Sequence, residues 1–236
     1  QGHSNLNNKT RRYDPRNLLY FTMPAMAICM DIPLVIIENV RSIKSASENV
    51  VGITKKLFRA HDYFVNEVIL DGVHCGIAQT RKRHFLIASK FEEPNVDAAI
   101  DQLRTPTLTF NDVNSDLPIL EQTTGLLEGN PKLSNENIDR INHLHNTNQL
   151  DLKNELRPVC HQEGHTYPAV YGRIDGNKPA GTITTGFSSP GRGRFIHPNE
   201  PRMITVREAA RVQSFPDWYF LPAEQLGLNR INLTKI

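Results

Sequence analysis

The chain of 236 residues is predicted to adopt an α/β fold, in which a layered sheet is followed by a smaller irregular region. Two observations carry this prediction. Over residues 1–90, helical patterns alternate with short apolar runs rich in β-branched residues, as is typical of α/β layers. From about Phe91 to Thr166 the periodicity fades into a stretch rich in Asn, Asp, Glu and Thr. We therefore expect three segments: a sheet-containing part over 1–90, an irregular region over 91–200, and a final segment over 201–236 whose helix returns to the sheet-containing part.

The first 90 residues are expected to form two helices and three strands. The first helix contains Pro24, which should kink it or end it early. The first strand is an unbroken apolar run, which predicts burial on both faces, as in a parallel sheet. The helices are expected over Asn17–Met30 and Ser47–Ala60, and the strands over Pro33–Ile37, Tyr63–Leu70 and His84–Ala88.

The irregular region still contains apolar side chains that indicate some packed structure. They are Ile119, Leu120, Leu126, Leu127, Ile138, Ile141 and Leu144. The start of the last helix is marked by Thr205-Val206-Arg207-Glu208, a capping box in which Thr205 and Glu208 each accept a backbone N–H of the other. Pro216 should end that helix near Ser214–Phe215.

Composition narrows the class of protein. Hydrophobic residues make up 39% of the chain, as in ordinary globular domains, and no apolar run approaches the roughly 20 residues of a membrane helix. The three cysteines, Cys29, Cys75 and Cys160, have no metal-ligand or disulfide spacing, so we expect no metal site and a reducing, intracellular setting.

The charge is unevenly distributed along the chain. Residues 1–90 carry a net charge of +6, residues 91–166 carry −8, and residues 167–236 carry +4. Two basic segments around an acidic one favour contact of the flanks with a polyanion such as nucleic acid. The alternative is that these charges only form solvated surfaces.

Glu38-Asn39-Val40 lies where the first strand is expected to end. Ligand sites of open α/β sheets lie just beyond the carboxyl ends of strands, so Glu38 is a candidate general acid. The alternative is an ordinary polar turn, which is the common role of a Glu-Asn pair after a strand.

A basic cluster, Gln79-Thr80-Arg81-Lys82-Arg83, comes directly before the last of these strands. Arg81 and Arg83 should share one face of that strand, where two guanidinium groups could bind a carboxylate, a phosphate or a base carbonyl. A basic strand edge that discourages aggregation is the alternative. Arg192-Gly193-Arg194 is equally ambiguous, since it suits a phosphate backbone or any flexible loop.

The order and spacing of these segments resemble those of the DNA (cytosine-5) methyltransferases. In that family a Pro-Cys-Gln segment carries the nucleophile, and this chain begins with the residues that follow the cysteine. The matching segments are Gln1-Gly2-His3-Ser4, Asp14–Tyr20, Glu38-Asn39-Val40, the Gln-x-Arg-x-Arg signature of Gln79, Arg81 and Arg83, the stretches Thr182–Thr185 and Pro190–Pro198, and the final block Arg202–Asp217.

The resemblance implies a Rossmann-like methyltransferase sheet, incomplete in this chain, with a target-recognition region over about 91–200. S-adenosylmethionine would be the methyl donor, with Leu19 at its apolar contact, and double-stranded DNA the substrate, with its cytosine flipped out of the helix. Glu38, next to Asn39, would protonate or hydrogen-bond ring N3 of the cytosine. Arg83 would hold its O2, and Arg81 would orient the site or the neighbouring carboxylate. The DNA-binding residues would be Gln1, Ser4, Arg16, Arg192 and Arg194.

The resemblance also implies that parts of the enzyme are missing from the sequence. The nucleophilic cysteine and the glycine-rich cofactor segment should precede Gln1, so we expect this chain to be inactive without that N-terminal portion or a complementing subunit. A catalytically dead DNA-binding or regulatory module is the alternative, and the long insert disfavours the branch acting on transfer RNA. Such an enzyme would act in the cytoplasm of a prokaryote, at the nucleoid, or in a eukaryotic nucleus.

Overall fold

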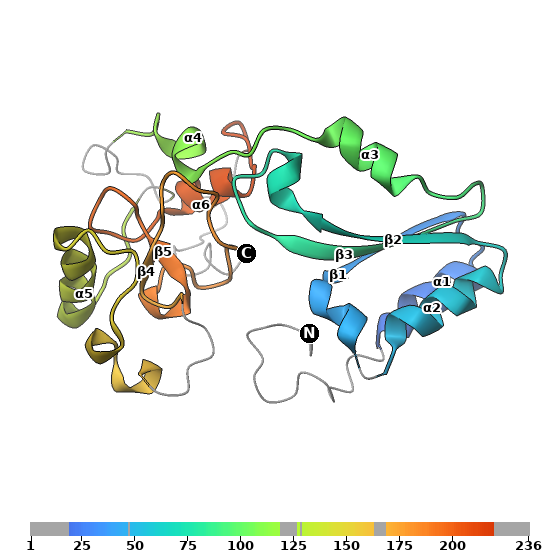
Figure 1. Cartoon of the computed structure of the whole chain (residues 1–236), viewed down its shortest axis with the longest axis horizontal. Helices are drawn as coiled ribbons and strands as arrows, with labels where there is room; N and C mark the ends of the chain where they lie inside the picture. Colours follow the sequence, from blue (N-terminus) through green and yellow to red (C-terminus); the bar gives the residue numbers. More distant parts are fainter. Residues whose placement is uncertain (1–18, 47, 119–126, 128, 163–168, 220–236) are drawn as a thin grey trace, which may run out of the picture. The chain divides into compact units, whose positions relative to one another are not determined.

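The computed structural model describes residues 19–46, 48–118, 127, 129–162 and 169–219 (Figure 1). The chain divides into two compact units. The first comprises residues 1–75 and 81–105, and the second comprises residues 76–80 and 106–236. No helix among the described residues is long and apolar enough to cross a membrane.

The first unit is built on a three-stranded antiparallel sheet in the order β1-β3-β2. The strands are β1 (Leu34–Val40), β2 (Phe64–Asp71) and β3 (Lys82–Ser89). The central strand β3 pairs with β2 along its whole length and with β1 from Arg83 onward, so that Ile37 lies opposite Leu86 on one side and Val65 lies opposite Ala88 on the other. This pairing places side chains of β1, β2 and β3 on two defined faces of the sheet.

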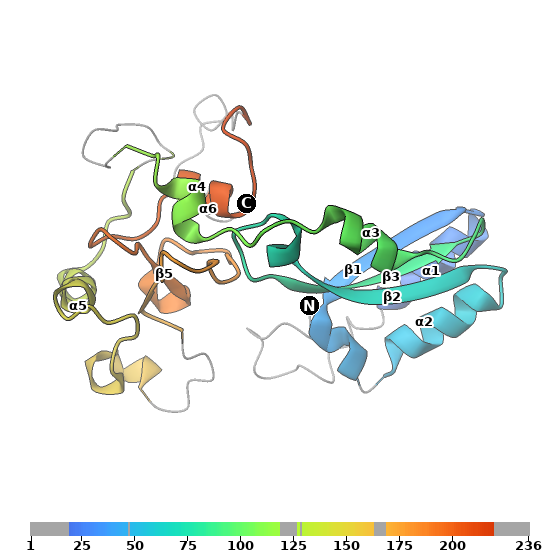
Figure 2. The ribbon, with the colours of Figure 1, turned by 45° about the horizontal axis from the view of Figure 1, so that its top comes forward.

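Helices α1 (Thr22–Cys29) and α2 (Val50–Arg59) cover one face of this sheet, and α3 (Val96–Leu103) lies on the opposite side beside β2 (Figures 1 and 2). The helical side chains Val50 and Phe58 and the strand residue Leu86 are fully buried in the shared core. Their burial fixes which face of each strand points inward, and therefore which residues point away from α1 and α2. Two short 3-10 helices, η2 (Arg41–Ser45) and η3 (Gly72–Cys75), follow β1 and β2.

The predicted position of each element is confirmed, but the predicted environment of the first strand is wrong. Strand β1 is antiparallel to β3, and its burial alternates: Val35 and Ile37 are buried, whereas Leu34 is 51% and Ile36 57% exposed. An apolar run cannot distinguish a strand buried on both faces from one with a single packed face. Nor does Pro24 kink α1, because it lies in the first turn, where its missing N–H costs no helical hydrogen bond.

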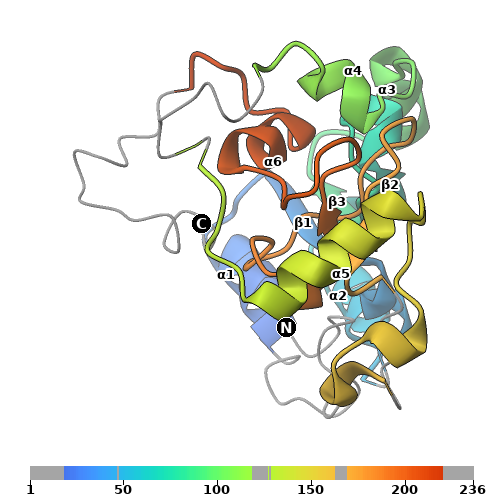
Figure 3. The same ribbon diagram turned by 90° about the vertical axis from the view of Figure 1, so that its left-hand side faces the viewer.

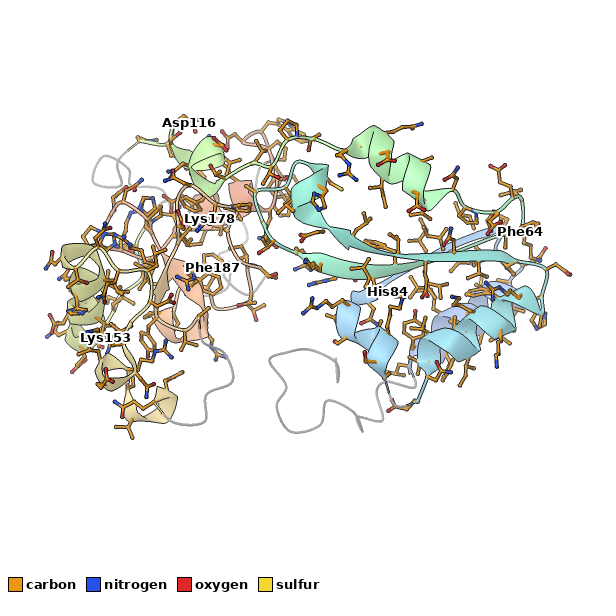
Figure 4. All side chains as sticks on the ribbon, viewed as in Figure 1. Phe64, His84, Asp116, Lys153, Lys178 and Phe187 are labelled. Atoms are coloured by element: carbon orange, nitrogen blue, oxygen red, sulfur yellow. The ribbon has the colours of Figure 1, made fainter. Side chains whose placement is uncertain are left out.

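The second unit packs short elements around one hydrophobic core. Its helices are α4 (Phe110–Asn114), α5 (Asn135–Asn146) and α6 (Val206–Val212), and its strands are β4 (Gly172–Arg173) and β5 (Arg194–Ile196), which pair in parallel. Three 3-10 turns, η5 (Asn154–Leu156), η6 (Val159–His161) and η7 (Pro190–Arg192), lie between them. Figure 3 shows α5 from outside this unit, and Figure 4 labels Phe187, a core residue of it.

Part of this core had been indicated by the sequence. Ile141 and Leu144 of α5 are buried, and Leu127 packs against the same cluster, whereas Ile138 is largely exposed. Ile119, Leu120 and Leu126 lie outside the described residues. The expected division into 1–90, 91–200 and 201–236 stays a prediction, as does the return of the last helix to the sheet-containing part. In the structure α6, which belongs to the final segment, packs against α4 in the second unit.

The entry to α6 is held by a buried ionic network. The predicted capping box is confirmed: Thr205 Oγ1 accepts the Glu208 N–H, and Glu208 Oε2 accepts the Thr205 N–H at 2.7 Å. The same carboxylate receives two hydrogen bonds from the Arg202 guanidinium, at 2.7 and 2.9 Å, and Arg202 also binds Glu200. Burial alone would lower the pKa of Arg202, but these carboxylates raise it, so the guanidinium stays charged.

Candidate active site

An ion pair joins the two neighbouring strands β1 and β3 on the face that α1 and α2 do not cover. Arg83 Nε lies 2.8 Å from Glu38 Oε1. The register explains this contact, because Glu38 lies opposite Phe85 and Arg83 is two residues away on the same face of β3. The Glu38 side chain is 48% exposed and that of Arg83 is 20% exposed. A carboxylate is thus held in place while part of it remains open to a ligand.

The sequence had suggested that the first strand ends just before Glu38. In the structure β1 continues through Val40, so Glu38 lies within the strand. The reason is that Asn39 and Val40 continue the antiparallel ladder, opposite His84 and Arg83. The polar turn that was the alternative interpretation is therefore wrong. Asn39 points to the other face from Glu38, and its side-chain oxygen accepts the Val40 N–H at 2.8 Å.

Arg81 comes immediately before β3, close to the ion pair. Its backbone N–H donates to Asp71 Oδ1 at 3.1 Å, which fixes the start of the strand. Burial and the positive charge of Arg83 lower the pKa of Arg81, and the negative charge of Glu38 opposes that shift. The charges of Arg81, Arg83 and Glu38 therefore act on one another. The hydrogen-bonded contact with Glu38, however, comes from Arg83 and not from Arg81.

A second polar group supports the strands from the core side. His84 is fully buried, and its Nε2 lies 2.9 Å from Glu67 Oε2; Figure 4 labels His84 on the sheet. Glu67 also binds Lys55 at 3.1 Å. Burial alone would raise the pKa of Glu67, but the hydrogen bonds from His84 and Lys55 lower it to about 2. His84, Glu67 and Lys55 thus connect β3, β2 and α2 on the face of the sheet opposite Arg83. No sequence pattern had indicated this cluster.

The remaining predicted site residues are in different situations. Leu19 is 64% exposed at the start of the first helical segment, where it offers an apolar surface. Arg192, at the end of η7, is exposed, and its side chain has no hydrogen-bond or ion-pair partner among the described residues. Arg194 is engaged: its guanidinium donates to the carbonyls of Leu150 and Arg173 and pairs with Asp151. Gln1, Ser4 and Arg16 lie outside the described residues.

Sequence reasoning had noted Gln79 only as part of a signature. Its side chain is fully buried, and neither the oxygen nor the nitrogen of its amide has a hydrogen-bond partner among the described residues. A buried amide without partners costs about 1–3 kcal/mol. Gln79 is therefore a buried polar group, two residues before Arg81, whose amide the described residues leave without a hydrogen bond.

The comparisons with known proteins agree on one family. Residues 1–231 match the family described as C-5 cytosine-specific DNA methylase. The Type II methyltransferase M1.BsuMI of Bacillus subtilis is 36% identical over 220 residues, which cover 93% of this chain and 51% of that protein. The Type II methylase M.HgiDII of Herpetosiphon aurantiacus is 37% identical over 174 residues, which cover 68% of this chain and 48% of that protein.

This chain therefore spans about half the length of the curated relatives that it matches. Among solved structures, the Dnmt2 methyltransferase of S. pombe matches with a TM-score of 0.56 at 15% identity, over 86% of this chain and 60% of that one. At such low identity the likeness concerns the fold alone. It confirms the expected fold class, an α/β methyltransferase fold of which this chain holds a part.

Proposed function

Because this chain belongs to the C-5 cytosine-specific DNA methylase family, we propose that it holds the target base in an enzyme that methylates carbon 5 of cytosine in DNA. The observation that carries the proposal is the Glu38–Arg83 ion pair beside Arg81. It joins two segments 45 positions apart in the sequence, both singled out for their chemistry, into one polar group with a half-exposed carboxylate.

The reaction explains why a carboxylate is needed at this point. Carbon 5 of cytosine is a poor nucleophile until a thiolate adds to carbon 6 and turns the ring into an enamine. That addition pushes negative charge onto ring N3, so an acid that donates a hydrogen bond to N3 favours it. We assign this role to Glu38. A module that only bound DNA would need no acid here, and this favours the enzyme over the catalytically dead alternative.

The two arginines have separate proposed roles. Arg83 would donate to the cytosine O2, and its Nε bond to Glu38 would at the same time orient the carboxylate. Arg81 would add positive charge beside both groups and thereby stabilise negative charge that develops on the bound ring. Asn39 would keep the end of β1 in register through its bond to the Val40 N–H.

S-adenosylmethionine would supply the methyl group when bound. In this chain Leu19 would contribute to its pocket, and the exposed apolar side chain fits such a contact. The nucleophile and the rest of that pocket would come from an N-terminal portion or a complementing subunit, so we expect no methyl transfer by these residues alone.

DNA would be contacted by Gln1, Ser4, Arg16, Arg192 and Arg194. The exposed Arg192 is suited to reach a base edge or a phosphate. Arg194 is partly exposed, so it would contact the DNA while its bonds to two carbonyls hold the loop. Residues 91–200 would form the target-recognition region. The type II relatives favour DNA modification of the restriction–modification kind, which in a prokaryote would take place at the nucleoid. Marking of DNA in a nucleus is the alternative for a eukaryotic source.

The test is to incubate the reconstituted full-length enzyme with DNA and S-adenosylmethionine and to sequence the DNA after bisulfite treatment. Cytosines protected within one recurring sequence are the expected result. Binding of DNA without any protected cytosine would refute the enzymatic proposal and favour the regulatory module.

A further inference from the structure

A polar cavity of about 440 Å³ opens on the second unit. It lies at the ends of α4 and α5 and beside β4. All of its lining residues belong to the second unit, whereas Glu38 belongs to the first. Its wall carries more amide and charged groups than apolar ones. Among its lining residues are His145, Asn148, Arg173, Asp175, Asn177 and Asn199.

The cavity contains a buried arginine without a counter-charge. Arg173 is only 9% exposed, and its Nη2 donates to the amide oxygen of Asn148 at 2.6 Å. Its Nε is buried without an acceptor among the described residues, and no carboxylate in this part of the chain forms an ion pair with it. A guanidinium cannot shed its charge in a protein, and a buried charge is costly unless an opposite charge or strong acceptors compensate it. An anion in the cavity would provide that compensation.

The neighbouring charges leave the cavity positive. Asp175 also lines it, but its carboxylate already binds Lys178 at 2.8 Å and accepts the Asn177 N–H at 3.1 Å. Burial and the charge of Arg173 lower the pKa of His145, so this imidazole is neutral at pH 7. Its Nε2 is buried and has no hydrogen-bond partner within the described ranges. Figure 4 labels Lys178 in this unit.

We propose that this cavity binds a phosphate group of the DNA backbone, with Arg173 as its charge partner. The DNA component rests on the proposed function. A phosphate brings both the full negative charge that Arg173 lacks and several oxygens that the side-chain amides of Asn148, Asn177 and Asn199 can reach as donors. The neutral edge of a base would leave the charge of Arg173 uncompensated, so a role in reading the base sequence is disfavoured.

The test uses the reconstituted full-length enzyme and short fluorescein-labelled duplexes of cognate and unrelated sequence, with fluorescence anisotropy between about 50 and 200 mM salt. Arg173→Gln should weaken binding of both duplexes by the same factor, roughly tenfold. The slope of log affinity against log salt should become shallower by about 0.9, the value for one phosphate contact.

A second variant covers the case in which Arg173→Gln fails to fold. Asn199 is exposed at the rim of the cavity, and its side chain forms no hydrogen bond with the described residues, so Asn199→Asp should fold and repel a phosphate. The matched control is Asn154→Asp, an exposed position in η5 of the same unit outside the cavity, which makes the same change in net charge. Its affinity should equal that of the unmodified protein.

Three results would overturn the proposal: an unchanged salt slope, a loss confined to the cognate duplex, or an equal loss in Asn154→Asp. The first shows that no phosphate is bound there, the second indicates a base contact, and the third an effect of net charge alone. Binding of an unrelated duplex requires no methyl transfer. Failure of the phosphate site and failure of the methylation assay are therefore separate outcomes.

Discussion

Replacing Glu208 by Gln should strongly destabilise the second unit, because it removes one charge from a buried network. Glu208 is 4% exposed and accepts hydrogen bonds from Arg202 Nη1, Arg202 Nη2 and the Thr205 N–H. Removing one partner of a buried ion pair costs about 3–5 kcal/mol. Arg202 keeps its contacts with the partly exposed Glu200 at 2.9 and 3.0 Å, so we expect the lower end of that range. The capping box should survive the change, because the Gln amide oxygen can accept the same Thr205 N–H.

The assay is urea unfolding followed by circular dichroism, together with hydrogen exchange of the peptide that contains α6. A loss of about 3 kcal/mol shifts the urea midpoint by roughly 1–3 M for a typical dependence on denaturant. The matched control is Glu155→Gln, an exposed carboxylate of the same unit, which should change stability by less than about 0.5 kcal/mol. If Glu208→Gln were as stable as this control, the inference that the network holds the entry to α6 would be wrong.

Two further predictions concern stability. Hydrogen bonds lower the pKa of Glu67 from its ordinary 4.5 to about 2, so its contribution to the free energy of unfolding is present above pH 4.5 and is lost as the pH falls toward 2. Glu67→Gln should remove that part of the acid dependence. Urea midpoints of the variant that still fell across this pH range in parallel with those of the unmodified protein would contradict the prediction. Gly193→Ala should cost about 1–3 kcal/mol, since the new Cβ would lie 2.7 Å from the buried Phe195 ring. In thermal unfolding, the control Gly181→Ala, whose Cβ would meet nothing within 4 Å, should have little effect, and equal shifts of the two midpoints would show that the ring gives way.

The sequence predicted where most elements lie because their signals are local. Thr205 and Glu208 mark the start of α6 by a hydrogen-bonding pattern that needs only four residues, and the structure has both of its bonds. Val50 and Phe58 lie at helical spacing and are both buried under the sheet. Such signals depend on backbone geometry within one element and require no knowledge of its neighbours.

What the sequence could not provide was the partner of each element. The run Leu34–Ile37 is apolar throughout, so its pattern did not show that β1 pairs antiparallel with β3 and leaves one face exposed. The same pairing brings Glu38 to Arg83, although Arg81 was as good a candidate from spacing alone. The buried Arg173 lies in a two-residue strand with no periodic signal, and only its burial identifies it.

The central claim is that Glu38 acts on the bound cytosine, and methyl transfer by Glu38→Gln in the reconstituted full-length enzyme tests it most directly. Gln keeps the shape of the side chain but cannot donate a proton as an acid does, so the rate should fall by roughly 10²–10⁴. DNA binding should be retained, and Glu155→Gln, far along the chain in the second unit, should methylate at the unmodified rate. A Glu38→Gln enzyme that leaves as many cytosines protected from bisulfite, at the same rate, would contradict the account.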